Sequence, residues 1–545
     1  MENDRGLRDR IAEKFIFVGF GLSGAAALIY EVVWTRSLST IFGSSTYALA
    51  TMLAAFMAGL SVGGGVGAIL SHRIKRLNIA FALCELGIGL LGILTIPIIK
   101  TLTPLYIKTF YAFHLSFNTF SLVQFVVIFL VMGIPTTLMG LTFPIVVKLF
   151  SRGGRDVGTQ SGYLYSINTF GAIIGSLSAG FLLIPLLGVK GSAIVAASLN
   201  IFVATVILIL SKDFKKLSIA AAAVLAVAPV SVMIDKPLLP IFSYYNAFRF
   251  GSYEMVKAMF DSLLTSKGYR VLYHREGING DVTLMEYRLP GLADGLALVN
   301  NGKQEAGDEK GFALLAYLPY FAYSVDKPRT ALNIGLGSGH TLHYLSGFPL
   351  EHIDSVELSK GILEANRLFL RPNLFSDPRI EHIQADGRNY LLLTRKSYDI
   401  IIVSPSWAVE LSSAGLLTDE FFASAKDRLT SNGMCAVWVD FFMMSHDDLE
   451  IVMRTFARHF SHSAAWYVEG DFIVLTGSNS PVIRPEQEII QAINVLSPGL
   501  QDKYNLAVSG QAFERLPLGR INTDDDPIIE FRNARNIITW RSDES

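Results

Sequence analysis

A glycine-rich loop at residues 335–339 has the residue types and spacing of a nucleotide-binding site. The apolar residues before it can form a buried strand, and the residues after it can form a helix. Glycines in such a loop let the backbone bend sharply and let a ligand approach the helix N-terminus without meeting Cβ atoms. We therefore expect a bound nucleoside to contact Gly335, Gly337, Ser338 and Gly339.

Acidic residues follow the next two predicted strands. Glu357 ends the second strand, about 18 residues past the loop, where a carboxylate can accept hydrogen bonds from both ribose hydroxyls. Asp386 and Gly387 follow the third strand, where an adenine would lie. His340 replaces the third glycine of the dinucleotide fingerprint, which favours an adenosyl ligand of the S-adenosylmethionine type over NAD. The alternative is a glycine turn beside two solvated acids.

These residues need a parallel sheet to bring them together. Apolar strands alternate with helical stretches in the second half of the chain, a pattern typical of a Rossmann-type α/β sheet. A final pair of strands looks like an edge hairpin across Glu469-Gly470. The predicted strands are 330–335, 352–357, 380–385, 398–403 and 434–439, and the hairpin is 464–468 with 471–476.

A small antiparallel β module precedes this sheet. Three short strands with alternating apolar residues, near 271–274, 282–287 and 296–299, are separated by glycine-containing turns. The chain therefore divides into a helical region, a charged and Tyr-rich linker, the β module and the α/β domain. The predicted boundaries of the four parts are 1–234, 235–268, 269–328 and 329–545.

The N-terminal region has the composition of a membrane domain. Hydrophobic residues make up 51% of the whole chain and charged residues only 17%, well below the roughly 25% of soluble proteins. The apolar residues gather in about seven runs, most of them near the ~20 residues that cross a bilayer as a helix. The predicted spans are 15–42, 45–71, 78–99, 119–149, 160–187, 191–211 and 217–234.

Charge and cysteine content exclude several classes of protein. Residues 1–216 hold 17 Lys and Arg against 8 Asp and Glu, whereas the rest of the chain is net acidic. Neither half interleaves basic and aromatic residues as a nucleic-acid surface would. The two cysteines, Cys84 and Cys435, are too few and too far apart for a disulfide framework or a cysteine metal site. We expect no metal and no nucleic-acid partner.

Basic residues in alternate connections predict the orientation in the membrane. They cluster at 72–76, 148–155 and 212–216, which places these connections and the N-terminus in the cytoplasm of a multi-pass inner (plasma) membrane protein. The C-terminal half is then external with seven spans and cytoplasmic with six or eight. The amphipathic connection 100–118 is predicted to be an interfacial helix.

Ionisable residues within the apolar runs are candidates for a function in the membrane. Glu31 and Arg36 lie in the first run and Glu85 in the third, where an unpaired charge costs several kcal/mol. Either they form a structural ion pair, with Arg36 reaching the headgroups, or they line a proton or substrate path. The glycines at 59, 63 and 67 predict a bare helix face against which another helix packs closely.

Several motifs together resemble the spermidine synthase family of polyamine aminopropyltransferases, and most closely its membrane-bound members. The resemblance covers nearly the whole chain. The matching segments are Ala331–Leu342, Val356–Leu358, Asp386–Leu391 and Tyr398–Val403, with Leu28–Arg36, Arg275–Gly277, Asn301–Lys303 and Asn522–Asp525 in support. The resemblance implies a class I methyltransferase-like sheet that follows a multispanning half in the chain. It also implies a homodimer.

The resemblance further implies a reaction. In the family, an amine attacks the aminopropyl carbon of decarboxylated S-adenosylmethionine and releases methylthioadenosine. The family's acids in the glycine loop and in an Asp-x-x-Asp loop correspond here to Ser338, Ser404 and Trp407. Serine stays neutral near pH 7 and cannot replace a carboxylate as base or counter-ion. Residues that could substitute as acids are Glu410 and Asp440, and beside them Asp308 and Glu309.

Three functions follow from these residues. The first is an aminopropyltransferase with a relocated acid. The second is a transferase that uses S-adenosylmethionine itself, such as a methyltransferase. The third is a catalytically inactive membrane sensor or assembly protein that retains the fold. The triplet at 524–526 could bind a cation, but its place before Pro527 is more typical of a turn.

Overall fold

The computed structural model divides into two compact units. The first comprises Met1–Gly43, Ala48–Lys257 and Glu276–Ile278, and the second comprises Ser44–Tyr47, Ala258–Arg275 and Asn279–Ser545. The residues that the structure describes are 2–113, 116–151, 156–211, 254, 269–277, 279–287, 295–305, 309–323, 327–406, 411–440, 444–468, 472–480, 484–497, 507–508, 513, 516 and 518–539.

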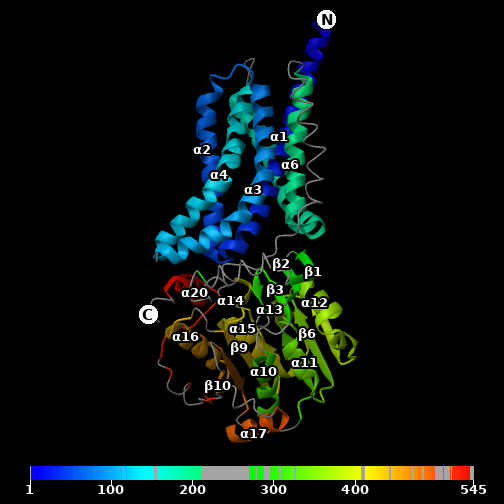
Figure 1. Ribbon diagram of the computed structural model, residues 1–545, viewed down its shortest axis with the longest axis vertical. Helices are drawn as coiled ribbons and strands as arrows, with labels where there is room; N and C mark the ends of the chain where they lie inside the picture. Colours follow the sequence, from blue (N-terminus) through cyan, green and yellow to red (C-terminus); the bar gives the residue numbers. More distant parts are fainter. Residues whose placement is uncertain are drawn as a thin grey trace. The chain divides into compact units, whose positions relative to one another are not determined.

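The first unit is a bundle of long apolar helices (Figure 1). Five helical segments are long and apolar enough to cross a membrane, with the fifth spanning Val157–Leu210. This confirms the predicted helical character of the N-terminal half. The helices are α1 (Glu2–Phe42), α2 (Thr46–Ser71), α3 (Leu77–Phe113), α4 (Phe117–Phe150), α5 (Val157–Ser178), the π-helical turn η1 (Ala179–Leu183) and α6 (Ile184–Leu210).

Two boundaries that were predicted for the membrane spans can be compared with the observed helices. The break expected between 187 and 191 coincides with Gly188, whose backbone leaves the helical region at φ 73° and ψ 175° inside α6. The span predicted at 78–99 agrees with the apolar segment Leu77–Ile99, but α3 continues beyond it to Phe113, where the sequence predicted a separate interfacial helix. An apolar run ends where hydropathy falls, but a helix continues while its backbone hydrogen bonds persist. The predicted span 217–234 lies outside the described residues.

Glycines on α2 allow α4 to approach closely, as their spacing predicts. A Cβ atom at Gly59 would collide with the Thr136 side chain, and one at Gly63 with the Thr137 carbonyl. At Gly67 it would lie 3.1 Å from the Leu141 oxygen. Small residues four positions apart thus form the contact surface between two helices.

The second unit begins with a small antiparallel sheet. Its strands are β1 (Tyr269–Gly277), β2 (Gly280–Tyr287), β3 (Gly295–Asn300) and β4 (Lys303–Gln304), in the order β1-β2-β3-β4. Asn301 and Gly302 connect β3 to β4 with positive φ values of 49° and 80°. Two such residues form the hairpin turn that asparagine followed by glycine favours. The predicted β module is confirmed, with β4 in addition.

The main sheet has eight strands in the order β12-β10-β11-β9-β8-β5-β6-β7. The strands from β5 to β9 run parallel, and β11 pairs antiparallel with both β9 and β10. This is the order of a class I methyltransferase-like sheet, which confirms the predicted fold. The strands are β5 (Thr330–Ile334), β6 (His352–Glu357), β7 (Ile380–Gln384), β8 (Tyr398–Val403), β9 (Leu429–Asp440), β10 (His462–Val468), β11 (Phe472–Ser478) and β12 (Ala507–Val508).

Helices cover both faces of this sheet (Figure 1). Alternate strand residues enter two cores: Ala331 and Ile353 pack with Leu342, whereas Leu332 and Val356 pack with Leu391. The helices are α10 (Glu309–Ala322), α11 (His340–Ser346), α12 (Lys360–Ala365), η2 (Asn366–Leu370), η3 (Pro372–Ser376), α13 (Gly387–Leu393), α14 (Leu411–Ala414), α15 (Asp419–Asp427), α16 (His446–Ala457), α17 (Glu486–Leu496) and α20 (Ile528–Thr539).

Candidate nucleoside site

The glycine-rich loop joins β5 to α11 at the carboxyl end of the parallel strands. Gly335, Gly337 and Gly339 all have positive φ, at 88°, 51° and 76°. At Gly335, a Cβ atom would also lie 2.5 Å from the carbonyl oxygen of Ser404. Only glycine adopts this conformation readily, so the loop's fold explains its composition.

Glu357 is bonded to this loop from the end of β6. Its Oε2 accepts the backbone N–H of Leu336 at 2.9 Å, and its Oε1 accepts that of Ser359 at 2.8 Å. The residue is buried, with 7% of its surface exposed. A carboxylate has about four acceptor positions, so the N–H groups of the loop leave part of its capacity free for ribose hydroxyls. The structure thus places Glu357 beside the loop, where the sequence predicted it.

The electrostatics of Glu357 reflect burial and a second carboxylate. Burial raises the pKa of Glu357, and the negative charge of Glu305 adds to this rise. Backbone N–H groups of Ser359, Leu336 and Gly337 oppose it. The charge of a second acidic side chain therefore acts on Glu357, and the sequence analysis did not identify that side chain.

Glu305 belongs to a buried polar group that sequence reasoning missed. Its carboxylate accepts a hydrogen bond from Ser406 Oγ at 3.3 Å and one from Asn300 Nδ2 at 3.1 Å. Lys303, only 5% exposed, donates from Nζ to Ser406 Oγ at 2.6 Å and lies 4.0 Å from Glu305 Oε2. The hydroxyl of Ser406, in the loop after β8, therefore connects that loop to the Lys303–Glu305 ion pair of the β4 segment.

The Asn-Gly turn is the sequence signal that could have revealed this group. A two-residue turn fixes the register, so that Lys303 pairs with Asn300 and the Glu305 N–H reaches the Leu298 carbonyl at 2.8 Å. Strand alternation then buries Lys303 and exposes Gln304. The position of Ser406 depended on the tertiary structure and was not readable from local pattern.

The residues after β7 lie near the same edge. Asp386 caps α13, with its Oδ1 accepting the Asn389 N–H at 2.8 Å, and the Ala385 N–H bonds to the Glu357 carbonyl at 3.2 Å. A Cβ atom at Gly387 would collide with the side chain of Ile334. Gly387 therefore lets α13 start directly beside the end of β5. Contact of Asp386 with an adenine stays a prediction.

The two serines that stand at the family's acid positions have protein partners. Ser338 is 5% exposed and its Oγ is hydrogen-bonded to His340 Nδ1 at 2.6 Å. The His340 ring stacks on Phe312, with 6.1 Å between centroids. Ser404 donates its N–H to the Ile334 carbonyl at 2.9 Å, which fixes the loop after β8 against the glycine loop.

The other acidic residues that the sequence analysis proposed lie at separate places in the second unit. Asp440 ends β9 opposite Phe472 of β11 and is half-buried. Glu309 begins α10. Asp524 forms a bidentate ion pair with Arg388. Such a pair is typical of a structural loop and not of a cation site. Three predicted residues, Glu410, Trp407 and Asp308, lie outside the described residues.

The ionisable residues of the apolar runs belong to the first unit. Glu31 and Arg36 are half-buried on α1. Glu85 is fully buried on α3 and accepts hydrogen bonds from Ser23 and Asn200. Among the described residues, the structure records no ion pair that involves Glu85.

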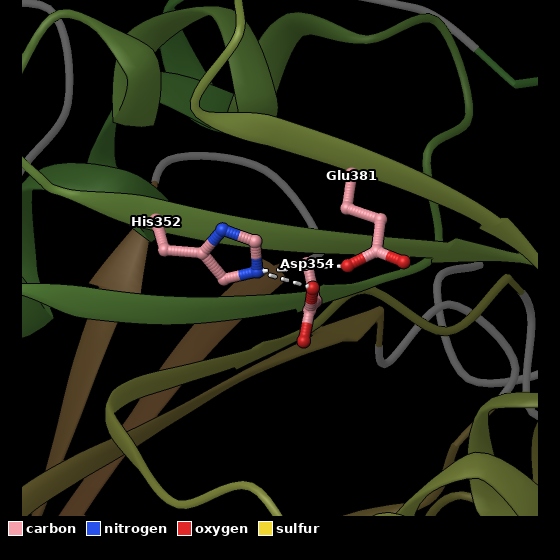
Figure 2. A group of neighbouring side chains, drawn as sticks. All are labelled: His352, Asp354 and Glu381. Atoms are coloured by element: carbon pink, nitrogen blue, oxygen red, sulfur yellow. Dashed lines mark hydrogen bonds and ion pairs between the residues drawn. The ribbon is translucent and has the colours of Figure 1, made fainter.

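One group in the second unit has the composition of a metal site. It lies at the amino ends of strands β6 and β7, whereas the glycine loop lies at the carboxyl ends of the strands. Figure 2 shows His352, Asp354 and Glu381 turned toward one another, with ligand atoms within 4.8 Å. Lys396 Nζ already bonds to Asp354 at 2.9 Å and to Glu381 at 3.1 Å. Tyr398 also donates to Asp354, at 2.5 Å. The group is therefore a hydrogen-bonded network of side chains in which Lys396 pairs with both carboxylates.

The sheet order and the glycine loop bonded to Glu357 define a class I methyltransferase-like domain. Residues 313–469 match the family model of the spermine/spermidine synthase domain. The C-terminal part of the chain therefore carries a spermidine synthase domain, joined to an N-terminal half with several apolar helices.

Relatives of known name extend this match over most of the chain. The chain is 24% identical over 453 residues to a polyamine aminopropyltransferase of Corynebacterium efficiens, covering 78% of this chain and 77% of that protein. It is 22% identical over 473 residues to polyamine aminopropyltransferase 2 of Aquifex aeolicus, covering 84% and 87%. A spermidine synthase solved with the transition-state analogue AdoDATO is 21% identical, with a TM-score of 0.36, over 48% of this chain and 85% of that one.

Proposed function

We propose that this protein is a membrane-bound transferase of the aminopropyltransferase type, with decarboxylated S-adenosylmethionine as its donor. The observation that carries the proposal is the buried carboxylate of Glu357 bonded to the backbone of the glycine loop. Five long apolar helices support a multi-pass membrane protein. The basic connections favour a cytoplasmic N-terminus, and the side of the second unit follows from the number of spans.

The donor supplies an electrophilic carbon next to a sulfonium. An attacking amine forms a new C–N bond there while the C–S bond breaks, and methylthioadenosine leaves with the electron pair of that bond. In this proposal Glu357 accepts the ribose hydroxyls, and the glycine loop lets the nucleoside approach the backbone closely. The amine must lose a proton, which requires an acceptor near the reacting atoms.

We assign the acceptor role to Glu305, in place of the acids that the family has and this chain lacks. Its carboxylate lies close enough to Glu357 to raise that residue's pKa. Ser406 and Asn300 donate hydrogen bonds to it, which fixes its orientation. A carboxylate there can hold a cationic amine and take its proton.

We expect the purified full-length protein to form methylthioadenosine from decarboxylated S-adenosylmethionine and an amine. Glu305→Gln should lower kcat about 100-fold or more, because general-base groups contribute about 10²–10⁴ in rate. Chromatography of the nucleoside product across a panel of di- and triamines measures both. Glu381→Gln, an acid at the opposite edge, should retain full activity. Absence of product with every amine would refute the aminopropyl reaction.

A second candidate is a transferase that uses S-adenosylmethionine with its carboxylate intact. Lys303 favours this reading, because a buried ammonium at the site could attract the donor's carboxylate. Ser338 and Ser404 carry no charge that would repel it. The two candidates differ in the donor that the site prefers.

Calorimetry with both donors separates the candidates. The aminopropyl proposal predicts tighter binding of the decarboxylated compound. If Lys303 instead recognises a carboxylate, S-adenosylmethionine binds more tightly, and Lys303→Met should reduce that preference about tenfold, since hydrogen bonds to charged groups contribute about 1.5–3 kcal/mol. If the wild type binds S-adenosylmethionine and its decarboxylated form equally well, the charge of Lys303 and the charge of the acidic residues do not select the donor.

A further inference from the structure

Among the described residues of the helical unit, Glu85 is the one carboxylate that is fully buried. Glu85 on α3 has no exposed surface, and its two oxygens accept hydrogen bonds from helices on either side. Ser23 Oγ of α1 donates to Oε1 at 2.6 Å, and Asn200 Nδ2 of α6 donates to Oε2 at 2.6 Å. Three helices thus contribute one polar side chain each to the same point.

Neutral groups supply all the recorded hydrogen bonds to Glu85. Within the described part of the chain, no Lys, Arg or His pairs with this residue, and the hydroxyl and amide donors carry no net charge. A buried carboxylate without a positive partner is strongly unfavourable, more so between apolar helices. Either a cation beside Glu85 or a proton on its carboxyl group would neutralise this charge.

An unpaired oxygen of the same group provides a second, independent observation. Asn200 Oδ1 is buried, and no hydrogen-bond partner is found for it among the described residues. It belongs to the amide whose nitrogen contacts Glu85, so it lies within the same cluster. Native proteins seldom leave a buried amide oxygen unsatisfied, which points to a missing ligand.

We infer that Glu85, Asn200 and Ser23 form a binding site for a small monovalent cation. The ligand atoms are a carboxylate, an amide oxygen and a hydroxyl, which suit a hard cation or the N–H donors of a primary ammonium group. One carboxylate balances one positive charge, whereas Ca²⁺ and Mg²⁺ sites gather more acidic ligands. This site is independent of the reaction proposed for the second unit and assigns a function to the helical unit.

Thermal unfolding of the full-length protein in detergent tests this site. At constant ionic strength, tetramethylammonium chloride is replaced by sodium chloride or by methylammonium chloride. Tetramethylammonium is too large and has no N–H donors, so it serves as the reference salt. We expect at least one of the small cations to raise the melting temperature saturably, by about 2–4 °C at several times its dissociation constant.

Two variants and a matched control make the outcome specific. Glu85→Gln removes the charge and should abolish the saturable rise, whereas Glu31→Gln, the same change at a half-buried position of α1, should preserve it. If Glu85→Gln does not fold, Asn200→Leu removes only the amide and should weaken the response at least tenfold. No rise with either cation, or an undiminished rise in Glu85→Gln or Asn200→Leu, would overturn the proposal.

Discussion

Glu357→Gln is expected to weaken the binding of decarboxylated S-adenosylmethionine about 100-fold. The substitution replaces a carboxylate oxygen by an NH₂ group, which cannot accept the N–H of Leu336 or Ser359. It also removes the negative charge and one of the two acceptor oxygens that the ribose hydroxyls could use. A hydrogen bond to a charged group contributes about 1.5–3 kcal/mol, and a 100-fold loss of affinity is about 2.7 kcal/mol, so the loss of one such bond gives an effect of this size. Isothermal titration of the full-length protein measures the change.

The control for this prediction is Glu381→Gln. That residue lies at the beginning of β7, at the other end of the sheet, and is largely exposed. Its substitution should leave the dissociation constant within about twofold of the wild type. An unchanged affinity in Glu357→Gln would mean that the glutamate holds only the loop and does not contact the ligand.

Asp354→Asn is expected to destabilise the second unit by about 2–3 kcal/mol. The Asp354 carboxylate is completely buried and accepts hydrogen bonds from His352, Tyr390, Tyr398 and Lys396. An asparagine keeps the shape but loses the charge and one acceptor atom. Breaking a buried pair costs about 3–5 kcal/mol, and the half-exposed Lys396 reduces this figure. The melting temperature should fall by roughly 4–10 °C.

The pH dependence of stability provides a second readout for Asp354. Burial by itself raises the pKa of Asp354, but hydrogen bonds from Tyr398, Lys396, Tyr390 and His352 outweigh it and hold the pKa below its ordinary value. The stabilisation is therefore fully present above about pH 4 and is lost as the pH falls through the folded-state pKa.

The variant should consequently lose less stability in acid than the wild type does. Glu351→Gln removes an exposed ion pair with Arg329 and serves as the control, with an expected change below about 0.5 kcal/mol. Identical acid profiles for the wild type and Asp354→Asn would contradict the role assigned to the buried carboxylate.

The central sheet and the glycine loop were predictable because local pattern determines them. Strand β8 is largely a short apolar run, a pattern typical of a buried parallel strand, and β6 and β7 place apolar residues between polar ones. The chain must then turn at Gly335 and Gly339, since positive φ values are readily available only to glycine. Glu357 followed from its place at the end of the next strand.

The remaining features depend on tertiary contacts between distant segments. Lys303 and Ser406 are about a hundred residues apart, and their hydrogen bond has no local signature. The same holds for Asp354, whose partners come from β6 itself, from α13, from the loop before β8 and from the start of β8. Glu85 was recognised as an unusual residue, but its partners Ser23 and Asn200 required the packing of three helices.

Hydrogen–deuterium exchange with and without methylthioadenosine tests the central claim most directly. If the nucleoside binds at the carboxyl edge of β5 and β6, peptides that cover residues 335–339 and 357–359 should exchange more slowly in its presence. Peptides that cover 352–354 at the opposite edge should be unaffected. Unchanged exchange of both loop segments at a saturating nucleoside concentration would show that this edge of the sheet is not the binding site.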